Sequence, residues 1–203
     1  MVLSSAAIID RVAASVGNQV ITLRDVELEI RVSAFLNGEK PDLSAKKKLE
    51  TANRLVDQKL IQQEMESNRF PFPTATDVEP ALAQLKTTVF PTEADYRKAL
   101  GQYGITDQDV RNMLLRMWML QEFISLRFKP AVQVTDQEIH DYFEGVVAPA
   151  ARSAHPGQPV ELDAYRAQID EKLSGDKADG ELKNWLKEAY RRVHIVVHQE
   201  ALQ

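Results

Sequence analysis

The residues of this chain that could do chemistry are few and scattered. The four histidines are His140, His155, His194 and His198, and there is no cysteine. His194 and His198 lie four residues apart in a segment of strand-like composition, where this spacing puts them on one face about two pleats apart. Two histidines without a nearby pair of carboxylates make a poor zinc site. We therefore expect polar residues at a strand edge, and no metal.

The search for a catalytic motif is also negative. The glycine-rich patterns of dinucleotide and triphosphate binding, the HExxH metallopeptidase motif and the GxSxG nucleophile motif do not occur. Ser153 and His155 are neighbours only in a predicted loop, and no third residue completes a triad. Glu138, Asp141 and Glu144 follow a predicted helix start, where acidic residues complement the helix dipole. We expect no enzyme activity and no cofactor.

Composition excludes further classes of protein. The 203 residues carry 25 Lys and Arg against 30 Asp and Glu, a net charge of −5, so there is no basic excess for binding nucleic acid. No apolar run approaches the ~18 residues of a membrane span. Residues 1–7 are too short for a secretory signal, and they could mark the place where one was removed.

The longest predicted helix covers residues 105–128. Thr106 can cap its start, with Asp109 three residues later, and no Gly or Pro follows until Pro130. Helical spacing puts its apolar residues on two faces, whereas a surface helix needs one. The helix is therefore either central in the core, the favoured interpretation for this helix alone, or it offers one face to a partner. One face carries Val110, Met113, Leu114, Met117, Leu120, Ile124 and Phe128, and the other carries Leu115, Met119, Phe123 and Leu126.

Helix starts and stops organise the rest of the chain. Helix-capping residues occur at Thr22, Ser44, Thr74 or Thr76, Thr92 and Thr135. Two more helices are expected, over residues 162–173 and from about residue 180, with a break at Ser174-Gly175. Strand-like segments lie near both ends, and because isolated strands are unstable we predict that residues 9–16 pair with residues 193–197. The expected fold is mostly α, a multi-helix module closed by a small β pairing of the N-terminal and C-terminal strands.

Residues 145–159 are rich in Ala, Pro and Gly and are predicted to be a loop or linker. Residues 1–144 and 160–203 then form one folding unit, closed by the pairing of its two ends. A C-terminal segment reached through a flexible loop could also swap between two copies, giving a homodimer.

Four segments resemble one family. IDRVAASVGNQVITLRDVELE (residues 9–29) is similar to the opening of SurA-type periplasmic chaperones, with Gly17-Asn18 inverted from the usual Asn-Gly. LVDQKLIQQEMES (55–67) resembles the second helix of that family, and VTDQEIHDYFE (134–144) resembles the short helix that precedes its parvulin prolyl-isomerase domain. WLKEAYRRVHIVV (185–197) resembles its C-terminal helix and strand.

The resemblance implies an ATP-independent chaperone of the periplasm that binds unfolded or exported outer-membrane polypeptides in an apolar groove. Residues 145–159 are too few for the isomerase domain, and only six residues follow Val197, so we expect that domain to be absent. In this interpretation Val110, Met113, Met117, Leu120 and Ile124 are core, and the other face of the helix is the client-binding wall. The candidate peptide-binding residues are Leu115, Trp118, Met119, Phe123 and Leu126, together with Phe35 and Trp185. The helical spacing of Phe35 and Trp185 is also compatible with a place in the core.

Two other functions compete with the chaperone. The family relationship could bring prolyl-isomerase activity, which catalysis on a proline peptide would reveal. The chain could instead be a scaffold or self-association module, for which a single saturable partner, and no affinity for varied unfolded peptides, would be the signature.

Overall fold

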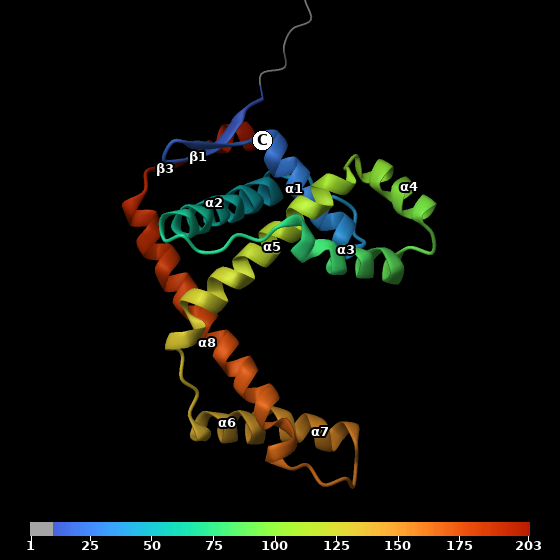
Figure 1. Cartoon of the computed structure of the whole chain (residues 1–203), viewed down its shortest axis with the longest axis vertical. Helices are drawn as coiled ribbons and strands as arrows, with labels where there is room; N and C mark the ends of the chain where they lie inside the picture. The colour runs from blue at the N-terminus through green and yellow to red at the C-terminus, as the bar shows by residue number, and fades with distance from the viewer. Residues whose placement is uncertain (1–9) are drawn as a thin grey trace, which may run out of the picture. The chain divides into compact units, whose positions relative to one another are not determined.

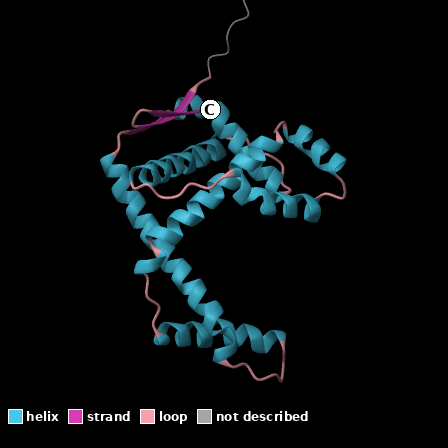
Figure 2. Cartoon of the chain, viewed as in Figure 1, coloured by secondary structure: helices cyan, strands magenta, loops and turns pink. Residues whose placement is uncertain are grey.

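The computed structural model describes residues 10–203 and consists mostly of helices with one small antiparallel sheet (Figures 1 and 2). The predicted fold class is thereby confirmed. Residues 1–9 lie outside the described residues. They include the segment 1–7 and Ile9, where the first strand was expected to begin. The chain divides into two compact units: the first extends to Gln121 and resumes at Glu188–Gln203, and the second is Glu122–Lys187.

The sheet of the first unit joins the two ends of the described chain. β1 (Val12–Val16) pairs with β2 (Gln19–Thr22) through a two-residue turn, and on its other side with β3 (Ile195–Val197), both antiparallel. Gly17 opens the turn at φ 59°, which is the glycine position of a type II′ hairpin. The predicted pairing of the terminal strands is confirmed, with Ala14 opposite Val197.

The helices of the first unit begin where short-range hydrogen bonds cap them. The Thr22 hydroxyl accepts from the backbone N–H of Asp25 at 3.2 Å, and Ser44, Thr92 and Thr106 cap their helices in the same way. These four caps, and the one at Thr135 in the second unit, are as predicted. The helices are α1 (Leu23–Asn37), α2 (Ala45–Ser67), α3 (Ala75–Val89, capped by Thr74), α4 (Glu93–Tyr103) and α5 (Asp107–Arg127), with the short η3 (Gln199–Leu202) at the C-terminus. The last residues of α5, from Glu122, belong to the second unit.

A cluster of apolar side chains from α1, α3, α4 and α5 forms one part of the core. The Phe35 ring stacks on Phe90 with a centroid distance of 5.5 Å and meets Tyr96 edge-on at 5.9 Å. The buried Tyr96 hydroxyl donates to Asp107 at 3.0 Å, which satisfies its polar end. The buried members of the cluster are Val32, Phe35, Leu82, Tyr96, Leu100, Ile105, Val110 and Met113.

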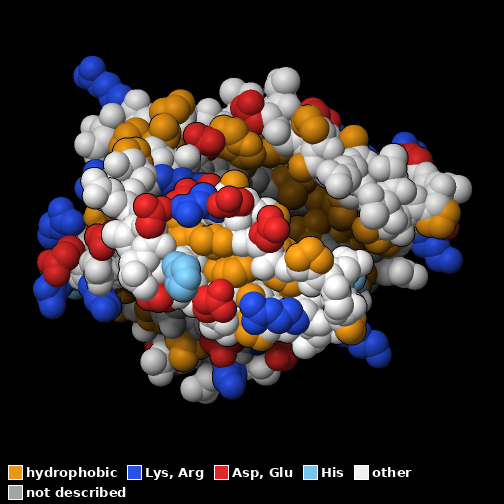
Figure 3. All heavy atoms as spheres, turned by 90° about the horizontal axis from the view of Figure 1, so that it is seen from below, with side chains coloured by type: hydrophobic (Ala, Val, Ile, Leu, Met, Phe, Trp, Pro, Cys, Tyr) orange, Lys and Arg blue, Asp and Glu red, His pale blue; other side chains and the backbone are white. Residues whose placement is uncertain are grey.

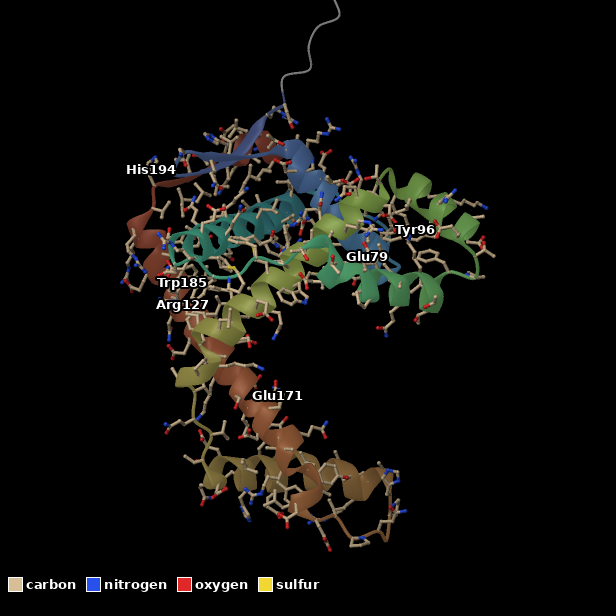
Figure 4. The ribbon with its side chains drawn as sticks, viewed as in Figure 1. Glu79, Tyr96, Arg127, Glu171, Trp185 and His194 are labelled. Carbon is tan, nitrogen blue, oxygen red and sulfur yellow. The ribbon has the colours of Figure 1, made fainter. Side chains whose placement is uncertain are left out.

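The second unit is held by an ion pair and by a smaller core. Lys129 of the short η1 (Lys129–Ala131) forms the ion pair with Glu171 at 2.6 Å; Figure 4 labels Glu171. The core residues are Ile139, Phe143, Ala148 and Ile169. They come from α6 (Asp136–Tyr142), the π-helical turn η2 (Phe143–Val147), α7 (Ala148–Ala154) and α8 (Leu162–Arg192), whose last residues belong to the first unit.

Two expectations about this region are wrong. The helix α8 runs without a break through Ser174 and Gly175, where an interruption was predicted. The expected linker at residues 145–159 contains α7 and part of η2, so only its residues 155–159 lack a helix. The structure also groups the residues differently from the single folding unit that was expected, because α6 and most of α8 belong to the second unit.

Within residues 10–203, no helix is both long enough and apolar enough to cross a bilayer.

Candidate functional site

The candidate site is a groove of about 370 Å³ that lies entirely within the first unit. Five separate segments build it: the strand β2, the helices α1, α2 and α5, and the loop between α2 and α3. Most of the exposed lining is apolar. Its residues are Val20, Ile21, Asp25, Leu28, Glu29, Leu55, Gln58, Lys59, Gln62, Phe72, Pro73, Leu115, Arg116 and Met119.

A buried carboxylate fixes the three helices of the groove. Glu29 on α1 is 3% exposed, and its side chain accepts from Arg116 Nη2 on α5 at 2.6 Å. Arg54 on α2 approaches its other oxygen at 3.7 Å. A buried charge is costly unless it is paired. Glu29 therefore holds α1, α2 and α5 in register at the groove wall.

The apolar side of the groove includes exposed residues. Phe72 and Val20 are both exposed, although they are large and apolar. Phe72 lies between Pro71 and Pro73, and each proline restricts the backbone of its own residue and of the residue before it. The loop therefore presents the Phe72 ring with little backbone freedom to lose on binding.

Three polar groups of the groove lack partners within residues 10–203. Lys59 is half-buried and forms no ion pair there. Gln58 Oε1 and Arg116 Nε are buried and have no hydrogen-bond partner. Buried polar atoms are usually satisfied, so unpaired ones on a groove indicate a place where water or a ligand completes the site.

The structure brings two of the seven predicted peptide-binding residues into this groove. Leu115 and Met119 line it. Trp118 and Leu126 are exposed but do not line it, so α5 does not present all its predicted residues to one site. The remaining three, Phe35, Phe123 and Trp185, are buried.

The assignment of the two faces of α5 needs correction. Met117, expected in the core, is 56% exposed, whereas Met119 and Phe123, expected on an open wall, are buried. Phe123 packs edge-on against Trp185 of α8, with ring centroids 5.0 Å apart; Figure 4 labels Trp185. Both faces of α5 therefore contribute core residues, because helices pack against the two faces at different points along its length.

The parts of the groove outside α5 were not predicted as a site. Val20, Phe72 and Lys59 lie on β2, in the loop between α2 and α3 and on α2, and none of them was among the candidate residues. The alternation of phenylalanine and proline at positions 70–73 is a usable signal, since it fits either an apolar group presented at the surface or a cap on the edge of the core. The approach of β2 to α5 has no sequence signal, since it depends on how the whole first unit packs.

The second unit has a hollow of its own, of about 550 Å³, between η2, α7 and α8. Its floor includes the small residues Ala150, Ala151 and Ala154, and Tyr165 and Lys172 lie on its wall. Lys172 is paired with Asp176 on the same helix, and this hydrogen bond raises the pKa of the lysine. Its charge is thus already matched.

The described residues contain no cluster of metal-ligating side chains. Within residues 10–203, no group of three or more His, Asp or Glu side chains could hold a metal ion. The backbone carbonyl of His194, labelled in Figure 4, accepts from Gly17 N–H at 2.9 Å, which places His194 beside the end of β3. On the face drawn in Figure 3, basic and acidic side chains are intermingled with hydrophobic ones.

Comparison with known proteins gives this chain no family. No protein-family model matches the sequence, and no curated protein matches it either.

Proposed function

We propose that this chain is an ATP-independent chaperone of the periplasm that binds unfolded or exported outer-membrane polypeptides. The observation that carries the proposal is the groove of the first unit, which is built from five segments and has a mostly apolar lining with polar side chains among it. Unfolded polypeptides expose apolar side chains separated by polar backbone, and such a groove matches both.

The character of the groove supports binding of many sequences rather than one. Its lining includes the long, unbranched side chains of Met119, Lys59 and Gln62, which change rotamer at modest cost and adapt to different shapes. An unfolded client loses conformational entropy when it binds, so the affinity of each site is modest. The resemblance of residues 9–29 and 185–197 to SurA-type chaperones agrees with this proposal.

The direct test is suppression of aggregation. An outer-membrane protein is diluted from denaturant, without nucleotide, and light scattering is followed with and without a several-fold molar excess of this chain. We expect the scattering to fall. No effect at that excess would sink the proposal.

A matched pair of α5 variants locates the binding surface. Leu115 lines the groove and Leu126 is an exposed leucine that does not line it. Leu115→Asn should reduce suppression of aggregation, and Leu126→Asn should leave it unchanged. A loss at Leu126 alone would move the binding surface away from the groove.

We also propose that the chain does not catalyse prolyl isomerisation, and a proline-peptide assay that shows catalysis would contradict this.

A further inference from the structure

The groove follows the free edge of the sheet. β2 is an outer strand in the order β2-β1-β3, so one of its edges has no strand partner within residues 10–203. Val20 and Ile21 both line the groove, although successive strand residues point to opposite faces. A hollow that touches both must run along the strand edge rather than beneath one face.

The backbone groups that face this edge can be identified. Gly17 N–H donates to the His194 carbonyl and His198 N–H donates to the Ala13 carbonyl, both at 2.9 Å. Because hydrogen-bonding direction alternates along a strand, Ser15 between them also faces β3. Ser15 is opposite Val20, so the N–H and C=O of Val20 point away from β1, toward the groove.

The next residue of β2 whose backbone groups point away from β1 is Thr22, and its N–H already has a hydrogen-bond partner. Thr22 N–H donates to Asp25 Oδ2 at 2.9 Å as part of the cap of α1. Val20 therefore supplies the open donor and acceptor of this edge, and its side chain is 56% exposed. A peptide chain laid along the groove could form a pair of backbone hydrogen bonds with this residue.

The charges of the groove indicate which charge the bound chain should carry. Asp25 is engaged by Thr22, and Glu29 and Arg116 are engaged with each other. Lys59 is the lining charge that no ion pair balances within the described residues. A carboxylate on the occupant would complement the ammonium group of Lys59.

We propose that the occupant is an extended peptide segment that pairs with the backbone of Val20, inserts apolar side chains into the groove and places an Asp or Glu side chain against Lys59. This is strand addition to a sheet edge, in which the backbone provides affinity and alternate side chains provide specificity. The proposal rests on the proposed function and adds the binding mode and the client chemistry. The four residues of β2 span roughly 13 Å, which suits about four client residues.

The test uses the full chain and a defined peptide. The probe is an unlabelled octapeptide, acetylated and amidated at its ends, in which Val and Leu alternate with Ser and Thr around one Glu. Because both ends are blocked, the Glu side chain is the sole carboxylate of the probe. A second peptide carries Lys in place of Glu, and isothermal titration calorimetry gives Kd for both.

Two variants at Val20 separate the backbone from the side chain. Val20→Pro removes the outward N–H without touching the ladder to β1, since proline is tolerated where the N–H of an edge strand faces outward. Val20→Ala keeps the N–H and removes most of the side chain. We expect Val20→Pro to weaken binding of the Glu peptide about fivefold or more relative to Val20→Ala, with thermal melts confirming that both fold.

A charge reversal tests the carboxylate independently and does not depend on the strand. Lys59→Glu should weaken the Glu peptide several-fold and strengthen the Lys peptide relative to the parent chain. Equal Kd for Val20→Pro and Val20→Ala, or no change of peptide preference in Lys59→Glu, would overturn the binding mode. If the parent chain binds neither peptide and does not suppress aggregation, the proposed function fails as well. Suppression of aggregation with unaltered peptide preference overturns the binding mode alone.

Discussion

Glu29 is the residue whose loss should loosen the groove most. Its carboxylate is buried between Arg116 at 2.6 Å and Arg54 at 3.7 Å. Glu29→Gln keeps the shape and removes the charge that both arginines share. We expect the free energy of unfolding to fall by about 1–3 kcal/mol, less than for a fully buried pair, because both arginines can still reach water. Urea unfolding measures the change.

The matched control is a glutamate in an exposed ion pair. Glu93 pairs with Arg97 at 3.2 Å, and both side chains are mostly in solvent. Glu93→Gln should change the free energy of unfolding by no more than about 0.5 kcal/mol. If the two substitutions cost the same, Glu29 does not hold the helices together.

Glu138 should make the stability of the second unit depend on acid pH. The hydrogen bond from Lys177, followed by those from Thr135, lowers the pKa of Glu138 from 4.5 to about 2. Folding therefore favours the charged form. This contribution is fully present above about pH 4.5 and is lost as the pH falls toward 2.

The variant Glu138→Gln should flatten that acid limb in thermal melts recorded between pH 5 and about 2. Glutamine can still complete the capping box with Thr135, so the change reports the charge rather than the cap. Lys177→Met, which removes the main cause of the shift, should flatten the same limb. An acid dependence equal to that of the parent chain would show that another group is responsible.

At the scale of elements, local signals predicted most helix starts and the strand closure. The hydrogen bond from Asp25 N–H to Thr22 spans three residues, so its pattern is visible in sequence. The groove is different, since Glu29 and Arg116 are 87 residues apart. Their pairing depends on the packing of α1 against α5, which no local pattern specifies.

The helices of the second unit show why composition misled. Residues 145–159 were predicted to be a linker because of Gly145 and Pro149, yet η2 and α7 continue the helix α6 without a gap. Pro149 has no N–H to give to the preceding turn, and the wider π-helical turn η2 lies directly before it. Gly175 and Gly180 lie inside α8. Each costs about 1 kcal/mol relative to alanine, a small penalty in a helix of 31 residues.

The two interior glycines of α8 should accept alanine with a gain in stability. A Cβ built on Gly175 or Gly180 meets nothing within 4 Å, and neither has a positive φ. Gly175→Ala and Gly180→Ala should each raise the free energy of unfolding by about 0.5–1 kcal/mol. Gly104 is the control, because it caps α4 at φ 64°. Gly104→Ala should destabilise by about 1 kcal/mol, and a gain there, or a loss at Gly175, would contradict the argument.

For the whole molecule, the sequence order of the two units has a functional consequence. The second unit lies in sequence between two parts of the first, since Glu122–Lys187 falls between Gln121 and Glu188. Every residue that lines the groove belongs to the first unit. Client binding in the proposed mode therefore uses no residue of the second unit.

The closure can be tested together with the oligomeric state. The chain has no cysteine, so Ala14→Cys with Val197→Cys introduces a single possible pair. These residues are opposite each other in β1 and β3 and, between the hydrogen-bonded positions, should have Cα atoms about 4.5 Å apart, within disulfide reach. We expect oxidation to give a cross-linked monomer on a non-reducing gel. Ala14→Cys alone should give no internal cross-link. A covalent dimer formed by the double variant at micromolar concentration would instead show that β3 swaps between two copies.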